Sequence, residues 1–109
     1  YDVRRVWLEH ILPVKWKSNA YWRNTWKDEE AKRWINRLGN LTLLDRKLNE
    51  KASNAPFPDK KDIYAGKRGY PKTSFELTRR IQNYNNWTSK EVRIRHKYLL
   101  KEIRRMLKL

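Results

Sequence analysis

Hydrophobic and polar positions along the first half of the chain predict two strands with a helix between them. Residues 3–12 are rich in β-branched and aromatic side chains and stop at Pro13, which is typical of a strand. Residues 28–38 indicate a helix that begins with acidic residues, carries basic residues late and has Gly39 as a left-handed stop. Residues 40–44 form a short apolar run that predicts the second strand.

The second half of the chain predicts mainly helices. Three of them follow a side chain that can accept a hydrogen bond from the backbone of the first turn. These caps and helices are Asp45 before 46–53, Asp59 before 60–65, and Ser74 before a helix that runs to about residue 84. A basic loop is expected over 66–71.

The last predicted element is a long amphipathic helix that reaches the C-terminus. The sequence Thr88-Ser89-Lys90-Glu91 is a capping box, in which two side chains bind free backbone amides of the first turn. Apolar residues recur at helical spacing, so we expect one face to pack inward. The inward residues are Val92, Leu99, Ile103 and Met106, and the outward ones are Arg93, Lys97, Lys101, Arg104 and Lys108. His96 is expected to be a partly exposed residue of this helix without a role in a site.

Length and composition favour one small domain that binds a polyanion. The chain has 109 residues, and six Trp, six Tyr and two Phe can build a core despite a charged fraction of 36%. The net charge is +15, from 27 Lys and Arg against 12 Asp and Glu. Such a charge favours nucleic acid as the partner first and an anionic membrane surface second.

Several classes of protein are excluded by what the sequence lacks. Without cysteine there is no disulfide and no thiolate metal site. No apolar run reaches the length of a membrane span and no signal peptide pattern is present, so we expect a cytoplasmic chain with no membrane partner. The chain starts at Tyr1 rather than methionine, so we expect residues 1–109 to be one domain of a longer protein.

The candidate chemistry lies in the two predicted strands and the helix that follows them. Glu9 and His10 are adjacent on the first strand, Asn40 opens the second, and Asn49 lies on the helix. A histidine can accept a proton at neutral pH and act as a general base. A carboxylate and an amide oxygen suit a hard ion such as Mg²⁺, for which the protein commonly supplies only one or two ligands. Glu9 and His10 point to opposite faces of an extended strand, unless a bend near Pro13 brings them together.

The spacing of these residues resembles that of the HNH (His-Me finger) nucleases. That family has an acid–His pair on one strand, Asn-Leu at the next, and His or Asn nine residues after that Asn, as Asn49 follows Asn40. A longer set of residues is similar to the C-terminal nuclease domain of GmrSD-type proteins and covers nearly the whole chain. The set consists of Glu-His-Ile-Leu-Pro (9–13), Leu-Gly-Asn-Leu-Thr-Leu-Leu (38–44), Asn49, Ser-Asn-Ala-Pro-Phe (53–57), Lys60-Lys61, Tyr64, Ser74 and Trp87-Thr88.

The resemblance implies a fold and a role for each of these residues. The fold would be α+β and mainly helical, with a ββα-metal core of a two-stranded hairpin and a helix, further packing helices and a long C-terminal helix. His10 would be the general base, and Asn40 would hold the loop between the strands and so orient His10. Glu9 and Asn49 would bind one divalent ion, Mg²⁺ or alternatively Mn²⁺, with Asn54 as the other candidate for the second ligand. Relatives join this domain to an N-terminal domain and act on foreign or modified DNA.

Basic residues near the expected site are candidates for sequence-independent phosphate contacts. This group comprises Lys51, Lys60, Lys61, Lys67, Arg68 and Lys72, with Arg79, Arg80, Arg93, Arg104 and Arg105 as weaker candidates. The tryptophan-rich stretch 15–27 is expected to be irregular. Trp16, Trp22, Trp26 and Trp34 could stack on unpaired bases, but packing against the sheet is the favoured role.

The leading interpretation is a metal-dependent DNA endonuclease domain of a restriction or phage-defence protein. One alternative is a basic nucleic-acid-binding module that kept the fold without catalysis. The other is an RNase that uses the same residues, because the sequence does not reveal contacts to a 2′-hydroxyl.

Overall fold

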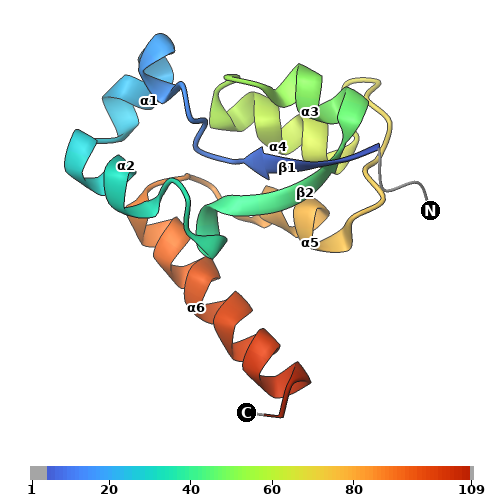
Figure 1. The fold of residues 1–109 in the computed structure, drawn as a ribbon. Coiled ribbons are helices and arrows are strands. Elements are labelled where there is room, and N and C mark those ends of the chain that lie inside the picture. Colours follow the sequence, from blue (N-terminus) through green and yellow to red (C-terminus); the bar gives the residue numbers. More distant parts are fainter. Residues whose placement is uncertain (1–4, 109) are drawn as a thin grey trace.

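The computed structural model describes residues 5–108. Two antiparallel strands cross the middle of the molecule, short helices surround them, and one long helix projects from the body (Figure 1). The strands are β1 (Val6–His10) and β2 (Leu41–Asp45), and the helices are α1 (Ala20–Thr25), α2 (Asp28–Trp34), α3 (Arg46–Ala52), α4 (Phe57–Ala65), α5 (Glu76–Arg79) and α6 (Ser89–Met106). Three 3₁₀ turns complete the described chain: η2 (Trp16–Ser18), η3 (Leu38–Asn40) and η4 (Arg80–Asn83). The expected α+β, mainly helical class is confirmed.

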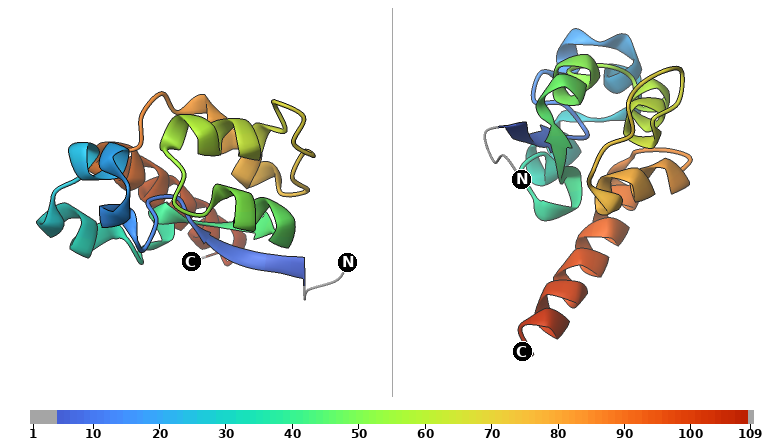
Figure 2. Two further views of the ribbon diagram at one scale, coloured as in Figure 1. Left: turned by 90° about the horizontal axis from the view of Figure 1, so that it is seen from above. Right: turned by 90° about the vertical axis from the view of Figure 1, so that its right-hand side faces the viewer.

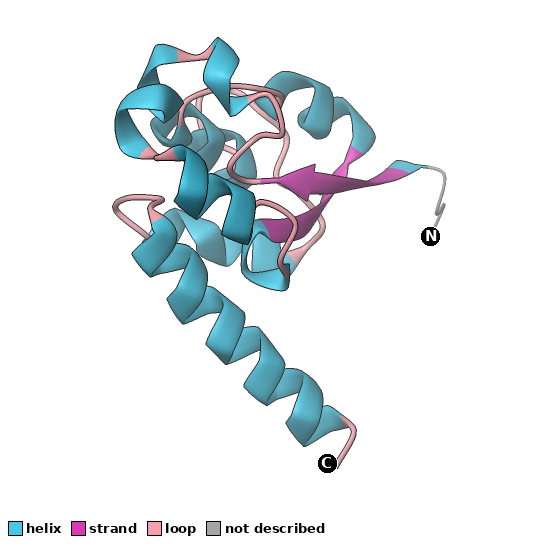
Figure 3. Cartoon of the chain, turned by 60° about the vertical axis from the view of Figure 1, so that its left-hand side comes forward, coloured by secondary structure: helices cyan, strands magenta, loops and turns pink. Residues whose placement is uncertain are grey.

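The two strands divide the molecule into a covered and an open side. Their register pairs Val6 with Asp45 at one end and His10 with Leu41 at the other. Glu9, Thr42 and Leu44 are buried, because α3 contacts both strands and α5 packs on β2. Leu8 and its partner Leu43 are exposed on the opposite side. The strands, with α3 and α4 above them and α6 below, are seen from another direction in Figure 3.

Both strands differ in extent from the expectation. The first ends at His10 rather than at residue 12, and residues 3 and 4 of the expected strand lie outside the described residues. The second begins one residue later than expected, because Asn40 belongs to the turn η3.

The tryptophan-rich stretch forms regular structure, whereas we expected it to be irregular. It contains the turn η2 and helix α1, whose first turn is capped by the Asn19 side chain through a bond from the Tyr21 amide. Trp22 and Trp26 are buried and donate their indole N–H groups to the carbonyls of Ala55 and Trp87. Trp16 is buried as well, and Trp34 is partly buried against the core. Burial in the core is thus confirmed for Trp16, Trp22 and Trp26, although the indole partners shown lie outside the strands.

Of the three expected helix caps, Asp45 occupies the N-cap position of α3 without a side-chain cap bond, whereas Asp59 and Ser74 are not at N-cap positions. The Asp45 carboxylate makes no cap bond and instead accepts hydrogen bonds from the hydroxyls of Thr73 and Ser74. With Ser74 committed to Asp45, the next helix begins only at Glu76 and passes into η4 after one turn. Helix α4 begins at Phe57, three residues earlier than expected, so Asp59 falls inside its first turn. Asp45 and Asp59 bind side chains that lie later in the chain, which the local cap pattern does not reveal.

Gly39 is not a left-handed stop, because the glycines with positive φ among the described residues are Gly66 and Gly69. Gly39 lies in η3, which packs directly against α6. A Cβ atom on Gly39 would lie 2.3 Å from the Val92 carbonyl oxygen and 2.7 Å from the His96 Cβ. The glycine is therefore required by the close approach of two backbones rather than by its dihedral angles.

Helix α6 begins with the expected capping box at Thr88 and Glu91. Val92 and Leu99 face inward as expected, but Ile103 and Met106 are 41% and 74% exposed. The apolar stripe continues past the point where the body can cover it, as the projecting end of α6 in Figure 2 makes clear. Within residues 5–108, no helix combines the length and the apolar character needed to cross a membrane.

Candidate active site

The residues singled out from the sequence gather around the C-terminal end of β1. Glu9 and His10 are its last two residues, Asn49 projects from α3, and Asn40 ends the turn that leads into β2. Glu9 and Asn49 are in direct contact. Asn54 lies in the link between α3 and α4, where its backbone carbonyl accepts a bond from the Asn19 side chain.

Glu9 is held on the covered side of the strands by three side chains. Its Oε1 atom accepts a hydrogen bond from the Asn49 amide at 3.0 Å. Its Oε2 atom accepts from Lys60 Nζ at 2.9 Å and from the Tyr64 hydroxyl at 2.5 Å. Lys60 and Tyr64 lie one turn apart on α4, so this helix supplies both donors from one face. The side chains of Glu9 and Lys60 are 3% and 0% exposed, so the two charges compensate each other away from water.

Burial sets the protonation chemistry of this cluster. Loss of solvent lowers the pKa of Lys60, and this effect outweighs the opposing attraction and hydrogen bond of Glu9. Burial also raises the pKa of Tyr64 well above its ordinary value, and the neighbouring Glu9 charge adds to the rise. Tyr64 therefore stays a neutral hydroxyl that donates to Glu9 near neutral pH.

Lys60 also donates to the backbone carbonyl of His10 at 3.0 Å. The buried Lys60 ammonium thus holds both the Glu9 carboxylate and the backbone of His10. We expected Lys60 to contact phosphate, and this expectation is wrong. Its Nζ atom faces the interior, so it offers no charge at the surface.

The other basic candidates divide by their partners. Lys51, Lys67 and Lys72 are exposed, whereas Lys61 is partly buried with its Nζ atom 5.8 Å from the centre of the Phe57 ring. Arg68 pairs with Asp59 and Asp62 in the structure. Among the weaker candidates, Arg80 and Arg105 pair with Glu76 and Glu102, Arg79 donates to the Thr73 carbonyl, and Arg93 and Arg104 are exposed.

The His10 side chain lies away from Glu9, as the alternation of a strand requires. Its ring Nε2 atom is 3.0 Å from the Oδ1 atom of Asn36, an exposed residue between α2 and η3. The two functional side chains therefore reach different parts of the fold. Glu9 contacts α3 and α4, whereas His10 contacts the segment before η3.

Asn40 is fully buried, and its side chain makes four hydrogen bonds. Its Oδ1 accepts from the Leu12 amide at 2.8 Å and from the Trp87 indole at 3.0 Å. Its Nδ2 donates to the carbonyls of Leu12 at 3.0 Å and Ile35 at 2.9 Å. These bonds use both lone pairs and both protons of the amide, so the side chain is satisfied without any direct contact to the His10 ring.

Helix α6 supports the turn η3 from below, which the sequence did not predict. His96 is partly exposed on α6 as expected, and its Nδ1 atom accepts the Gly39 amide at 3.0 Å, which makes it part of the frame. Arg95 is buried and donates to the carbonyls of Gly39 at 3.0 Å and Leu41 at 2.8 Å. Burial lowers the pKa of Arg95 below its ordinary value. The sequence did indicate the burial of Arg95, because this residue lies three positions after Val92 and four before Leu99, on the inward face of the helix.

The donor set beside Asn49 is compatible with a single hard metal ion. Glu9 Oε2 already has two donors, which leaves Oε1 as the ligand atom that this carboxylate can offer. The Asn49 amide that now donates to Oε1 would present its oxygen after a half-turn of the amide group. Two protein oxygens match the one or two ligands that proteins commonly supply to Mg²⁺, whose other positions are taken by water and phosphate. No group of three His, Asp or Glu side chains suited to a metal ion occurs in the described part of the chain.

Comparison with known proteins gives one family. The sequence model described as "GmrSD restriction endonucleases, C-terminal domain" matches residues 1–102. No curated protein is similar enough to the chain to count as a match.

We predict that Lys60→Met costs about 3 kcal/mol or more in the free energy of unfolding, because Glu9 is left charged and unpaired in the interior. Denaturant unfolding followed by circular dichroism measures this cost. Lys61→Met, a change of the adjacent and partly exposed lysine, is the control and is expected to stay within about 0.5 kcal/mol of wild type. Adding Glu9→Gln to Lys60→Met is expected to recover a large part of the loss. A Lys60→Met chain as stable as wild type would show that the ion pair does not matter.

Proposed function

The chain belongs to the family of C-terminal domains of GmrSD restriction endonucleases, and from this membership we propose that it is a metal-dependent endonuclease domain that hydrolyses DNA. The observation that carries the proposal is the arrangement at the end of β1. An oxygen donor pair, Glu9 and Asn49, lies on one side of the strand, and the ring of His10 emerges on the other. The order of two strands and a helix is that of a ββα-metal core, which we propose for β1, β2 and α3.

In this proposal His10 is the general base that takes a proton from the attacking water. An ordinary histidine is largely neutral near pH 7 and can accept that proton. The ring is partly exposed at the surface of the domain, so water and a phosphate can reach it. Lys60 holds the His10 carbonyl, and therefore the strand end is fixed while the ring stays accessible.

Glu9 and Asn49 would hold one divalent ion, Mg²⁺ or Mn²⁺. Such an ion supplies charge stabilisation to the phosphate and to the departing oxygen. Lys60 and Tyr64 keep the Glu9 carboxylate in one orientation with Oε1 directed at Asn49. Asn54 is the alternative ligand, but the structure gives contact with Glu9 to Asn49.

The positive charge of the chain suits a DNA backbone. Exposed Lys51, Lys67 and Lys72 are the proposed phosphate contacts, together with the partly exposed Lys61. Arg46, Lys47 and Lys72 line a cleft of about 610 Å³ near the far end of the strands. Such contacts set affinity and its salt dependence and do not read base sequence. We further propose that the domain serves restriction of foreign or modified DNA as the C-terminal part of a larger protein.

We predict that the purified chain nicks or linearises supercoiled plasmid in the presence of Mg²⁺ or Mn²⁺. His10→Ala is expected to lower the rate by about 10²-fold or more, because general-base catalysis contributes on that scale. Agarose gel analysis of a time course measures the rate. The exposed Asn24 on α1 offers a control, since Asn24→Ala is expected to cut at the wild-type rate.

The same assay separates the proposal from its alternatives. Equal cutting by wild type and His10→Ala would refute the role of His10. Tight, salt-sensitive DNA binding without cutting would indicate a non-catalytic binding module. Faster cutting of an RNA than of the DNA with the same sequence would indicate an RNase.

We predict that Asn49→Ala weakens Mn²⁺ binding by about tenfold or more, because it removes one of two proposed protein ligands. Isothermal titration calorimetry of the chain with Mn²⁺ measures the affinity. Asn54→Ala is the matched comparison, since it removes the same functional group five residues later and is expected to bind as wild type does. The opposite pattern would assign the second ligand to Asn54, and unchanged affinity in both variants would remove this amide pair from the site.

A further inference from the structure

The hydrogen bond between His10 and Asn36 determines which ring nitrogen carries the proton. His10 Nε2 lies 3.0 Å from Asn36 Oδ1. An amide oxygen only accepts hydrogen bonds, so the bond requires a proton on Nε2. A neutral imidazole carries one N–H group, and therefore Nδ1 has the free lone pair.

We propose that Asn36 is a positioning residue that holds His10 in its Nε2–H tautomer and directs Nδ1 toward the attacking water. This inference rests on the proposed function, because it assigns the basic atom of the same histidine. It adds a direct contact with the ring to the indirect role that the resemblance implies for Asn40, which is to hold the loop between the strands. Asn40 has no bond left for the ring, since its four bonds go to Leu12, Ile35 and Trp87.

The fold fixes the backbone on both sides of Asn36 even though its side chain is exposed. Asn40 Nδ2 binds the Ile35 carbonyl at 2.9 Å, and the Asn40 backbone amide binds the Arg37 carbonyl at 2.9 Å. The Arg37 amide in turn donates to the Trp34 carbonyl at 3.0 Å. The segment that carries Asn36 is thus tied at both ends to a buried residue.

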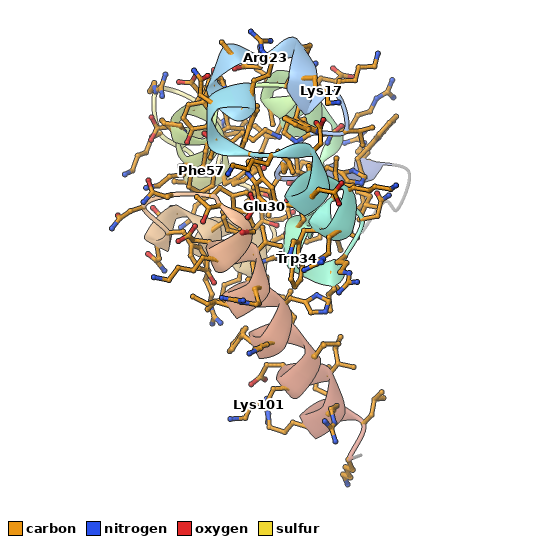
Figure 4. All side chains as sticks on the ribbon, turned by 90° about the vertical axis from the view of Figure 1, so that its left-hand side faces the viewer. Lys17, Arg23, Glu30, Trp34, Phe57 and Lys101 are labelled. Atoms are coloured by element: carbon orange, nitrogen blue, oxygen red, sulfur yellow. The ribbon has the colours of Figure 1, made fainter. Side chains whose placement is uncertain are left out.

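The aromatic surroundings add a second support. The Trp34 ring packs edge-on against His96 of α6 with centroids 5.6 Å apart, and the Arg37 guanidinium lies over Trp34 at 5.1 Å. Trp34 lies on the side of the body where α2 meets the upper part of α6, away from the projecting end marked by Lys101 (Figure 4). The residues on either side of the turn that carries Asn36 are therefore packed against each other and against α6.

The two ends of the His10–Asn36 bond share one anchor. Asn40 holds Leu12, two residues after His10, and Ile35, one residue before Asn36. A single buried amide therefore restrains the backbone near both ends of this bond. This is a built arrangement for keeping one ring orientation, which is what a base aimed at one water molecule needs.

The experiment is ¹⁵N NMR of the two histidine rings in the purified chain at about pH 9, where an ordinary histidine is neutral. The wild-type His10 ring is expected to show a protonated Nε2 and an unprotonated Nδ1. The chain has two histidines, and His10→Ala identifies which signals belong to His10. His96 is an internal reference, because its Nδ1 accepts the Gly39 amide and its tautomer is independent of Asn36.

Two variants separate the acceptor from mere side-chain bulk. Asn36→Leu removes the acceptor, so the His10 Nδ1 and Nε2 shifts are expected to move toward each other while those of His96 stay unchanged. Plasmid cutting is expected to fall by about tenfold or more as the ring loses its orientation. Asn36→Asp keeps an oxygen that only accepts and is expected to preserve the Nε2–H tautomer. Because Asn36 is exposed, the free energy of unfolding of Asn36→Leu is expected to lie within about 0.5 kcal/mol of the wild-type value.

The outcomes for this inference and for the proposed function are distinguishable. A wild-type His10 ring protonated on Nδ1, or His10 shifts that do not change in Asn36→Leu, would overturn the role of Asn36 whether or not the chain cuts DNA. The expected ring shifts in a chain that cuts no nucleic acid would support the tautomer and refute the endonuclease. Cutting by Asn36→Leu at the wild-type rate would show that the tautomer does not limit the reaction.

Discussion

The buried amide of Asn40 is the interaction on which the rest of the site depends. It joins three segments that are distant in sequence: the segment after β1 through Leu12, the link after α2 through Ile35, and the segment before α6 through Trp87. Leaving this buried amide without hydrogen bonds would cost more free energy than the bonds contribute to stability. The three segments therefore have to come together for the fold to form. Among the described residues, every buried side-chain nitrogen and oxygen has a partner, which is consistent with a frame that tolerates few substitutions.

Around this anchor the fold separates two chemical tasks across one strand. On the covered side, the Glu9 charge is balanced by Lys60 and steadied by Tyr64, so a carboxylate can stay buried next to Asn49. On the other side, the His10 ring is partly exposed and forms a hydrogen bond with the Asn36 side chain. A strand places neighbouring residues on opposite faces, and this geometry puts the oxygen donors and the base next to each other without direct contact.

The sequence predicted the order of the strands and helices apart from η2 and α1, but not the long-range partners. The pairing of β1 with β2 is the hairpin that the resemblance implied, and the capping box located the start of α6 to the residue. The caps at Asp45 and Asp59 failed because Thr73, Ser74 and Arg68 compete for those carboxylates across the fold. Lys60 looked like a surface cation, since nothing local indicates that α4 turns it toward Glu9. Asn36 had no motif at all, and its contact with His10 arises only when the segments held by Asn40 come together.

The most direct test of this account is amide hydrogen exchange in wild type and Asn40→Ala. The account predicts that the amides of Leu12 and Arg37 lose protection by a larger factor than the amides of the β1–β2 pairing. The Arg37 amide is the more telling of the two, because its own acceptor, the Trp34 carbonyl, is untouched by the substitution. If Leu12 and Arg37 instead exchange in step with the strand amides, Asn40 contributes only to global stability, and the claim that it positions the site is contradicted.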